Sequence, residues 1–349
     1  MAHNITVRPD GIAEAAFAKV PAWHGLGTVL DHPMTSVEAL RAAHLDWTVS
    51  KKPLHVVFDD GHSRLVDGKV ALVRDDTKDV LGVASDKYCI VNNVEAFQFL
   101  DGLVEEGSMT YEAAFSLGGG KRVVLLARMP GQDEITPSDV CLRYILLSTS
   151  HDGTSSIWFG PTSVRVVCAN TFMLAIGEKT VEAISSSEFD YLKKEFSISH
   201  RGDIESKLEK ARGIIKAVNA KFDEYTEQAR ELAKVRWTDA QFRQFLDIMC
   251  PEISLVDPDY TPRRAKAIEK TRNDITELYY QHEWQADVSI RQTAWAAVNA
   301  VVQHIDYLPR RGATPQAKAE ARFNVVLYGP GRDMKQRAFV AAQRISQLA

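Results

Sequence analysis

The sequence lacks the residue patterns that metal sites and disulfide frameworks require. It has four cysteines among 349 residues, and none of them stands in a Cys-x-x-Cys pair or a Cys/His cluster. Spacings of that kind identify zinc sites and disulfide-rich scaffolds, so the sequence predicts neither class. We expect the cysteines to be reduced core residues of a cytoplasmic protein that needs no metal and no cofactor.

Long apolar runs are also missing. The longest, such as residues 123–127, fall far short of the roughly 20 residues that a membrane-spanning helix needs. Residues 1–10 show no basic stretch followed by an apolar core, so we expect no signal peptide and no membrane partner. The hydrophobic share of 45% and the charged share of 25% are ordinary for a globular protein and exclude a disordered or collagen-like chain.

Charge is spread unevenly over a chain whose net charge is −4. Residues 1–192 carry 16 Lys and Arg against 25 Asp and Glu, whereas residues 309–349 carry eight against two. The first segment is therefore at −9 and the second at +6. A basic tail on an acidic body can contact phosphate backbones, can form a solvated helix surface, or can dock on the acidic body of a second subunit.

The first half of the chain has the pattern of an antiparallel sheet with short helices. Turn residues such as Asp59-Asp60-Gly61 and Asp67-Gly68 separate short β-forming runs, which predicts a β-meander. Thr35 and Glu38 have the spacing of a capping box, and Asn92 or Asn93 precedes apolar residues at helical spacing. The predicted strands cover residues 54–58, 64–66, 69–74, 80–84, 110–117, 121–129, 141–148, 154–159 and 162–168, and a helix is expected to start within residues 170–176.

From about residue 188 the apolar spacing becomes helical. Residues 188–234, with an apolar stripe over 204–218, are expected to form one long helix or a helical pair. Further helices are predicted within residues 237–249, 261–280, 294–305, 316–327 and 333–347. We therefore expect an α+β fold, with an antiparallel β-sheet region in the N-terminal half and a mostly α-helical C-terminal half. The expected divisions are a sheet-rich domain (1–186), a helical region (187–308) and a basic C-terminal tail with short helices (309–349).

Two glycine-containing turns are candidate sites. Gly118-Gly119-Gly120 precedes Lys121 and Arg122, but a strand follows it where a phosphate-binding loop needs a helix, which favours a hairpin turn carrying two cations. His151-Asp152-Gly153 could supply a general base or a metal ligand, yet no further ligand cluster accompanies it, which favours a tight turn. An enzyme that uses His151 and Asp152 stays the less favoured alternative.

Arginine side chains within predicted strands are the candidates for nucleic-acid binding. Arg165 stands among valines in an alternating string and must pair, reach solvent or line a groove, because burying it unpaired is costly. Asn170 or Thr171 is expected to cap the next helix, and no residue is predicted to be catalytic. The predicted nucleic-acid contacts are Lys121, Arg122, Arg128, Arg143 and Arg165 from the sheet, together with Arg310 and Arg311 from the tail.

Several motifs together resemble a family of phage- and plasmid-encoded proteins with a domain-of-unknown-function label. They lie over nearly the whole chain: Trp23-His24-Gly25-Leu26-Gly27, Arg74-Asp75-Asp76 with Leu81-Gly82-Val83, residues 119–128, Ser150-His151-Asp152-Gly153, residues 165–171, Thr293-Ala294-Trp295, His304-Ile305-Asp306 and residues 329–337. The resemblance implies an origin in a mobile element, and hence work on DNA or against host defence. The strand, hairpin and helix pattern around residues 151–171 also resembles the core of single-strand annealing recombinases.

These observations lead to two hypotheses. The first is a non-catalytic nucleic-acid-binding protein that holds single-stranded DNA in a basic groove during recombination or annealing, working as a homo-oligomer. The alternative is an anti-defence protein that binds a host defence protein through its acidic surface, because such a surface can mimic DNA.

Overall fold

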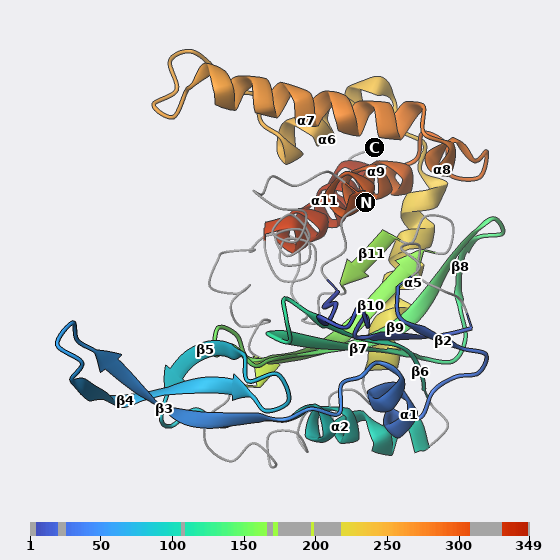
Figure 1. Ribbon diagram of the computed structural model, residues 1–349. Coiled ribbons are helices and arrows are strands. Elements are labelled where there is room, and N and C mark those ends of the chain that lie inside the picture. Colours follow the sequence, from blue (N-terminus) through green and yellow to red (C-terminus); the bar gives the residue numbers. More distant parts are fainter. Residues whose placement is uncertain are drawn as a thin grey trace.

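The computed structural model describes residues 5–19, 26–105, 109–165, 170–173, 197–198, 218–307 and 330–347. Within them a nine-stranded sheet forms the centre of the molecule (Figure 1). Its main path runs β11-β10-β9-β7-β6-β1-β2, while β8 pairs with β9 and β12 with β10. The strands are β1 (Ala15–Ala18), β2 (Thr28–Leu30), β6 (Thr110–Leu117), β7 (Arg122–Arg128), β8 (Asp133–Thr136), β9 (Asp139–Ser150), β10 (Ile157–Arg165), β11 (Asn170–Met173) and β12 (Ser197–Ile198).

The expected α+β fold is confirmed, with one change to the sheet. The pairs along the path are antiparallel except that β1 and β2 pair in parallel, so the sheet is mixed. Strand β7 lies in the middle of the path, and its residues Val123, Val124, Leu125 and Ala127 are fully buried. The continuous apolar run at residues 123–127 is therefore explained by a strand whose two faces are both covered.

A second sheet of three strands contains the meander. It has the order β3 (Val49–Val57), β4 (Ser63–Arg74) and β5 (Val80–Ser85), all antiparallel. The prediction of two strands at 64–66 and 69–74 was wrong, because both belong to β4. The register of β3 against β4 shifts between Pro53 and His55, and Gly68 has a positive φ of 68°. Asp67-Gly68 therefore forms an irregularity within a long strand, where a chain reversal had been expected.

Two further predictions after residue 150 were wrong. Residues 154–159 and 162–168 were expected to be separate strands, but β10 runs through Pro161, which pairs with Ile145. Residues 170–176 were expected to start a helix capped by Asn170, but Asn170–Met173 is strand β11. Its backbone pairs with β10 from Thr162 to Arg165, so this segment extends the sheet and satisfies the edge of β10.

The helices form two groups on the sheet. Helices α1 (Ser36–Ala42) and α2 (Asn93–Glu105) lie together on one side of the view, and most of the C-terminal helices lie on the other, while the yellow helix α5 runs past the sheet (Figure 1). The capping box of α1 is present as expected, and α7 begins with Pro262 after its cap Thr261. The C-terminal helices are α5 (Val218–Lys234), α6 (Asp239–Met249), α7 (Pro262–Tyr280), α8 (Glu283–Ala286), α9 (Ala294–Tyr307) and α11 (Pro330–Gln347).

Helix α9 is the centre of the C-terminal group, with every residue from Ala294 to Asp306 buried. Trp295 ties this helix to the large sheet, since its Nε1 donates to Asp139 Oδ2 over 2.7 Å. Asp306 forms a buried ion pair with Lys335 of α11. None of the helices in the described part of the chain has the length and apolarity to cross a membrane. The division at residues 186 and 308 stays a prediction, because both boundaries fall outside the described residues.

Candidate functional site

The small sheet packs against one end of the large sheet, and several of the sequence motifs meet at this junction. A Cβ atom on Gly82 of β5 would come within 2.2 Å of the carbonyl oxygen of Asp152. Gly153 has a φ of +77° and lies against Ala84 and Leu72 of the small sheet. Only glycine allows so close a backbone approach, so the His151-Asp152-Gly153 turn is fitted directly onto β5. We call this contact region the sheet junction.

His151 is enclosed at the sheet junction, with an exposed fraction of 2%. Its Nε2 lies 2.8 Å from Asn93 Oδ1, and its ring packs edge-on against Trp47 at a centroid distance of 5.2 Å. Its backbone N–H donates to the carbonyl of Lys121 over 2.8 Å. A general base must reach the proton that it removes, and this ring is surrounded by the protein's own groups. The geometry favours the structural interpretation of this histidine.

Asp152 is held by its own turn. Its Oδ1 accepts from Ser150 Oγ over 2.6 Å, and from the backbone N and Oγ1 of Thr154 over 2.9 and 2.6 Å. Burial alone would raise the pKa of Asp152, but these hydrogen bonds outweigh it and lower the pKa below its usual value. Within the described residues no three His, Cys, Asp or Glu side chains gather into a group that could hold a metal.

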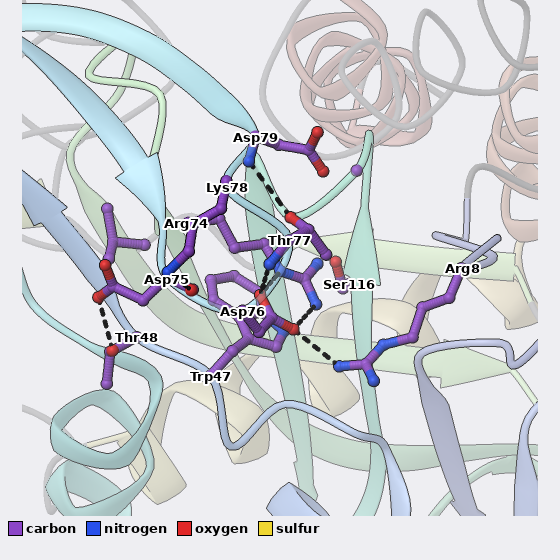
Figure 2. Close-up of polar contacts among 12 residues, drawn as sticks. Arg8, Trp47, Thr48, Arg74, Asp75, Asp76, Thr77, Lys78, Asp79 and Ser116 are labelled. Atoms are coloured by element: carbon purple, nitrogen blue, oxygen red, sulfur yellow. Dashed lines mark hydrogen bonds and ion pairs between the residues drawn. The ribbon is translucent and has the colours of Figure 1, made fainter. Parts of the chain in front are cut away.

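An ion-pair network centred on the buried Arg74 and Glu14 lies beside Trp47 at the sheet junction (Figure 2). Arg74, which is 1% exposed, donates from Nε to Asp76 Oδ1 over 2.6 Å and from Nη1 to Glu14 Oε2 over 3.1 Å. Arg8 contacts the same two carboxylates at 2.9 and 3.0 Å. Trp47 packs its ring on the Arg74 guanidinium, 4.2 Å from its centroid. Two cations are thus matched by two anions, as a buried charge requires.

The network also shifts the pKa values of Arg74 and Asp76. Burial by itself would raise the pKa of Asp76, but hydrogen bonds from Arg74 more than offset this and lower it. Burial would likewise lower the pKa of Arg74, yet its bonds to Asp76 and Glu14 raise it. Hydrogen bonds from Ser50 and Thr48, at 2.6 and 2.7 Å, lower the pKa of the neighbouring Asp75. The Arg74-Asp75-Asp76 motif therefore connects the N-terminal segment to β3 and β4.

The predicted nucleic-acid contacts in the sheet separate onto two faces. Arg122 and Arg128 are six residues apart on β7, so they lie on the same face. Arg128 is paired with Tyr144 of β9, which places Arg143, the adjacent residue, on the opposite face. The sheet arginines therefore do not converge into one groove.

Arg143 is committed to an internal ion pair. Its Nε donates to Asp133 Oδ2 over 2.8 Å, and its Nη2 contacts Asp133 and Asp223 at 2.5 and 2.7 Å. Its guanidinium also lies over the ring of Phe222 from α5, 5.3 Å from the centroid. The hydrogen bond to Asp133 is the main cause that raises the pKa of Arg143. These contacts assign Arg143 to the packing of α5 on the sheet.

The cations on the other face remain accessible. Lys121 is exposed in the turn before β7, and Arg122 is half-buried with its Nη2 3.4 Å from Thr154 Oγ1. Arg128 pairs with Glu112 at 3.2 Å while 37% of its side chain stays exposed. A partly exposed pair such as Arg128–Glu112 contributes little to stability, so Glu112 does not exclude a polyanion from Arg128.

The remaining predicted residues are placed only in part. The backbone of Arg165 pairs with Cys141 and with Asn170, while the side chains of residues 165 and 170 are outside the description. Arg310 and Arg311 lie outside the described residues.

Sequence reasoning missed three exposed cations of the small sheet. Lys52 of β3 pairs with Ala71 of β4, and Lys69 lies two residues before Ala71, so both share one face. Arg64 is farther along β4 and is also exposed. No ion pair within the described part of the chain involves these three side chains. Turn residues in the sequence predicted strands in this region. The pairing register, which brings Lys52 and Lys69 onto one face, could not be predicted from the sequence.

Comparison with known proteins identifies the family. A family model described as "Domain of unknown function (DUF932)" matches residues 80–326, well over half of the chain, and the match contains β5–β11 and α5–α9. Searches of curated proteins and of solved structures gave no significant match.

Proposed function

We propose that this chain, which belongs to the DUF932 family, binds single-stranded nucleic acid along the face of β7 that carries Arg122 and Arg128. The observation that carries the proposal is the sorting of the sheet arginines. Arg122 and Arg128 on one face are partly exposed to solvent, whereas Arg143 on the other face is mostly buried between two carboxylates. Lys121 in the adjoining turn adds a third accessible cation.

This arrangement suits a strand bound by its phosphates. Single-strand binding proteins combine cations that follow the backbone with apolar or aromatic side chains that the bases can contact. Between the two arginines β7 presents the half-buried Leu126, and the adjacent strand β6 presents the half-buried Phe115 opposite Val124. Contacts of this kind are largely independent of base sequence, because every base has an apolar face.

The wider proposal is a non-catalytic role in recombination on a mobile element of phage or plasmid type. A strand held by its phosphates keeps its base edges free for pairing, which is what annealing requires. His151 is enclosed by Asn93 and Trp47, which gives it a structural role beside this binding face.

The test is a titration of labelled oligonucleotides, single- and double-stranded, at several salt concentrations. Arg122→Ala/Arg128→Ala should weaken single-strand binding and make the plot of log K against log salt shallower by about 1.4, since each phosphate contact contributes about 0.7. The melting temperature should change little, because both side chains are partly solvated.

The matched control removes two exposed helix cations, Lys234→Ala/Arg243→Ala. It lowers the net charge by the same amount, so it should leave the salt dependence close to that of the wild type. An equal loss in both variants would show nonspecific attraction and overturn the β7 assignment. Absence of any binding by the wild type would overturn the proposal and favour an interaction with a host defence protein.

A further inference from the structure

The distal part of the small sheet projects from the body as a two-stranded ribbon (Figure 1). Pairing of β4 with β5 begins at Lys69, so among the described residues the segment 54–66 pairs only with itself. We call these residues the arm. A two-stranded ribbon alone is marginally stable in water, and its free edges invite pairing with another chain.

The arm exposes apolar side chains to solvent, where they contribute nothing to the stability of the ribbon. Val57 is 70% exposed, and Val56, Phe58 and Leu65 are each close to half exposed. The tip turn itself is well formed, because Phe58 N–H donates to the carbonyl of His62 over 2.8 Å. Val57 and Leu65 share one face of the ribbon and Val56 lies on the other, so the arm offers exposed apolar side chains to a partner on both faces of an ordered turn.

Two carboxylates stand at the end of this apolar surface. Asp59 and Asp60 are both exposed, and Asp60 Oδ1 accepts from the His62 N–H while its other oxygen lies 3.1 Å from the His62 ring. Negative charge at the tip opposes contact with a phosphate backbone. The tip, made up of Val57, Phe58, Asp59 and Asp60, therefore fits a protein surface that is apolar and basic.

A surface of that chemistry lies at the start of α7. Leu255 and Val256, in the loop that precedes this helix, are 79% and 91% exposed, and Val256 is the most exposed large apolar residue in the described part of the chain. Arg263 and Lys266 follow on one face of the first turns of α7, three residues apart. We call these four residues the α7 patch.

The carboxylates near the α7 patch are already engaged. Asp259 pairs with Arg264 at 3.0 Å, and Glu252 contacts Arg272 at 3.4 Å. Asp257 accepts from the backbone N–H of Asp259 over 2.9 Å. Within the described residues no carboxylate contacts Arg263 or Lys266, so these cations are left to meet charge from outside.

We infer that the tip of the arm docks on the α7 patch of a second copy of this chain. Apolar side chains meet apolar side chains, and two carboxylates meet two cations. The arm and the start of α7 project from the same side of the molecule (Figure 1). A two-fold axis between the copies can therefore pair each tip with the other copy's patch, which closes the assembly as a dimer with two identical contacts.

Charge exchange tests this inference. Asp59→Lys/Asp60→Asn keeps the acceptor that holds the turn, and Arg263→Glu/Lys266→Glu places acids in the first turns of α7, where a helix accepts them. The wild type should have the molar mass of two chains by light scattering at micromolar concentration. Each variant should be monomeric, with an unchanged circular dichroism spectrum and melting temperature.

The rescue is the sharper measurement. Mixing the two variants should restore a dimer, because one copy then offers a basic tip to an acidic patch and receives the original contact in return. A chain carrying all four substitutions should also dimerise. Val57→Ser/Phe58→Ser should weaken the dimer at least tenfold, whereas Val288→Ser, which removes a 78% exposed valine elsewhere, should not.

A monomeric wild type, or a dimer that survives the tip and patch variants, would overturn the inference. An assembly larger than two chains would overturn its two-fold closure. The inference is independent of the proposed nucleic-acid binding, since the tip and the patch share no residue with the β7 face. Loss of dimer and loss of DNA binding are therefore separate outcomes of separate variants.

Discussion

The sheet junction and the arm use the same kinds of residue in opposite ways. At the sheet junction Arg74 and Asp76 pair beneath Trp47, and the arginine is almost wholly buried. In the arm Arg64 and Asp59 are exposed, and neither takes part in an ion pair within the described residues. Buried charges must be paired, so those at the sheet junction have a structural role. Exposed charges and apolar groups, as in the arm, can bind a partner.

The largest expected difference between the two regions concerns their arginines. Arg74→Ala leaves the fully buried Glu14 without its main partner, which should cost about 3–5 kcal/mol of the free energy of unfolding. Arg64→Ala in the arm should change it by no more than about 0.5 kcal/mol. Urea unfolding followed by circular dichroism measures both, and similar losses would show that the regions do not differ in this way.

A smaller difference is expected at the glycines. Gly82→Ala drives a Cβ into the backbone of Asp152, and overpacking of this kind should cost about 1–3 kcal/mol. Gly61, in the turn of the arm, has a φ of +84° and open space around it, so Gly61→Asn should be tolerated because asparagine adopts such a conformation. Thermal melts of the two variants compare them. A stable Gly82→Ala protein would mean that the turn and β5 can move apart.

The smallest expected effect is a dependence on pH. The pKa of Asp76 is lowered in the folded state, so its contribution to stability is present above its ordinary pKa of 3.8 and is lost as the pH falls through the folded value. The wild type should therefore lose melting temperature between pH 5 and pH 3. Asp76→Asn should be less stable at pH 7 and lose less on acidification. An unchanged acid dependence would mean that Asp76 does not govern it.

The α+β fold and the helix starts could be predicted because their signals are local. The capping box at Thr35 and the proline after Thr261 act within one turn of helix, and both are where the sequence placed them. The strand boundaries at Gly68 and Pro161 could not be predicted in the same way, because pairing with β3 and β9 continues the strand through residues that usually end one. Asn170 shows the same effect. It was expected to cap a helix, but residues 170–173 pair with the edge of β10 and form strand β11.

The candidate site was predicted only as a set of residue types. Lys121, Arg122 and Arg128 remain candidates for nucleic-acid contact, and the accessibility of their side chains supports them. Arg143 was chosen for the same reason, but Asp133 and Asp223 come from other elements and neutralise it. No pattern around Arg143 in the sequence revealed those partners, which lie 10 and 80 residues away.

The sequence by itself determined that the first half is rich in strands and the second in helices. The spacing of apolar residues changes from that of strands to that of helices along the chain, and local caps and turns mark the ends of many elements. Only the tertiary structure decided which charges are paired and which are available. Pleat alternation and strand register put Arg122 and Arg128 on one face and Arg143 on the other, and the packing of α5 then buried one face against carboxylates. The same distinction separates the enclosed His151 from the exposed tip of the arm, since burial depends on contacts between distant segments that residue order alone does not specify.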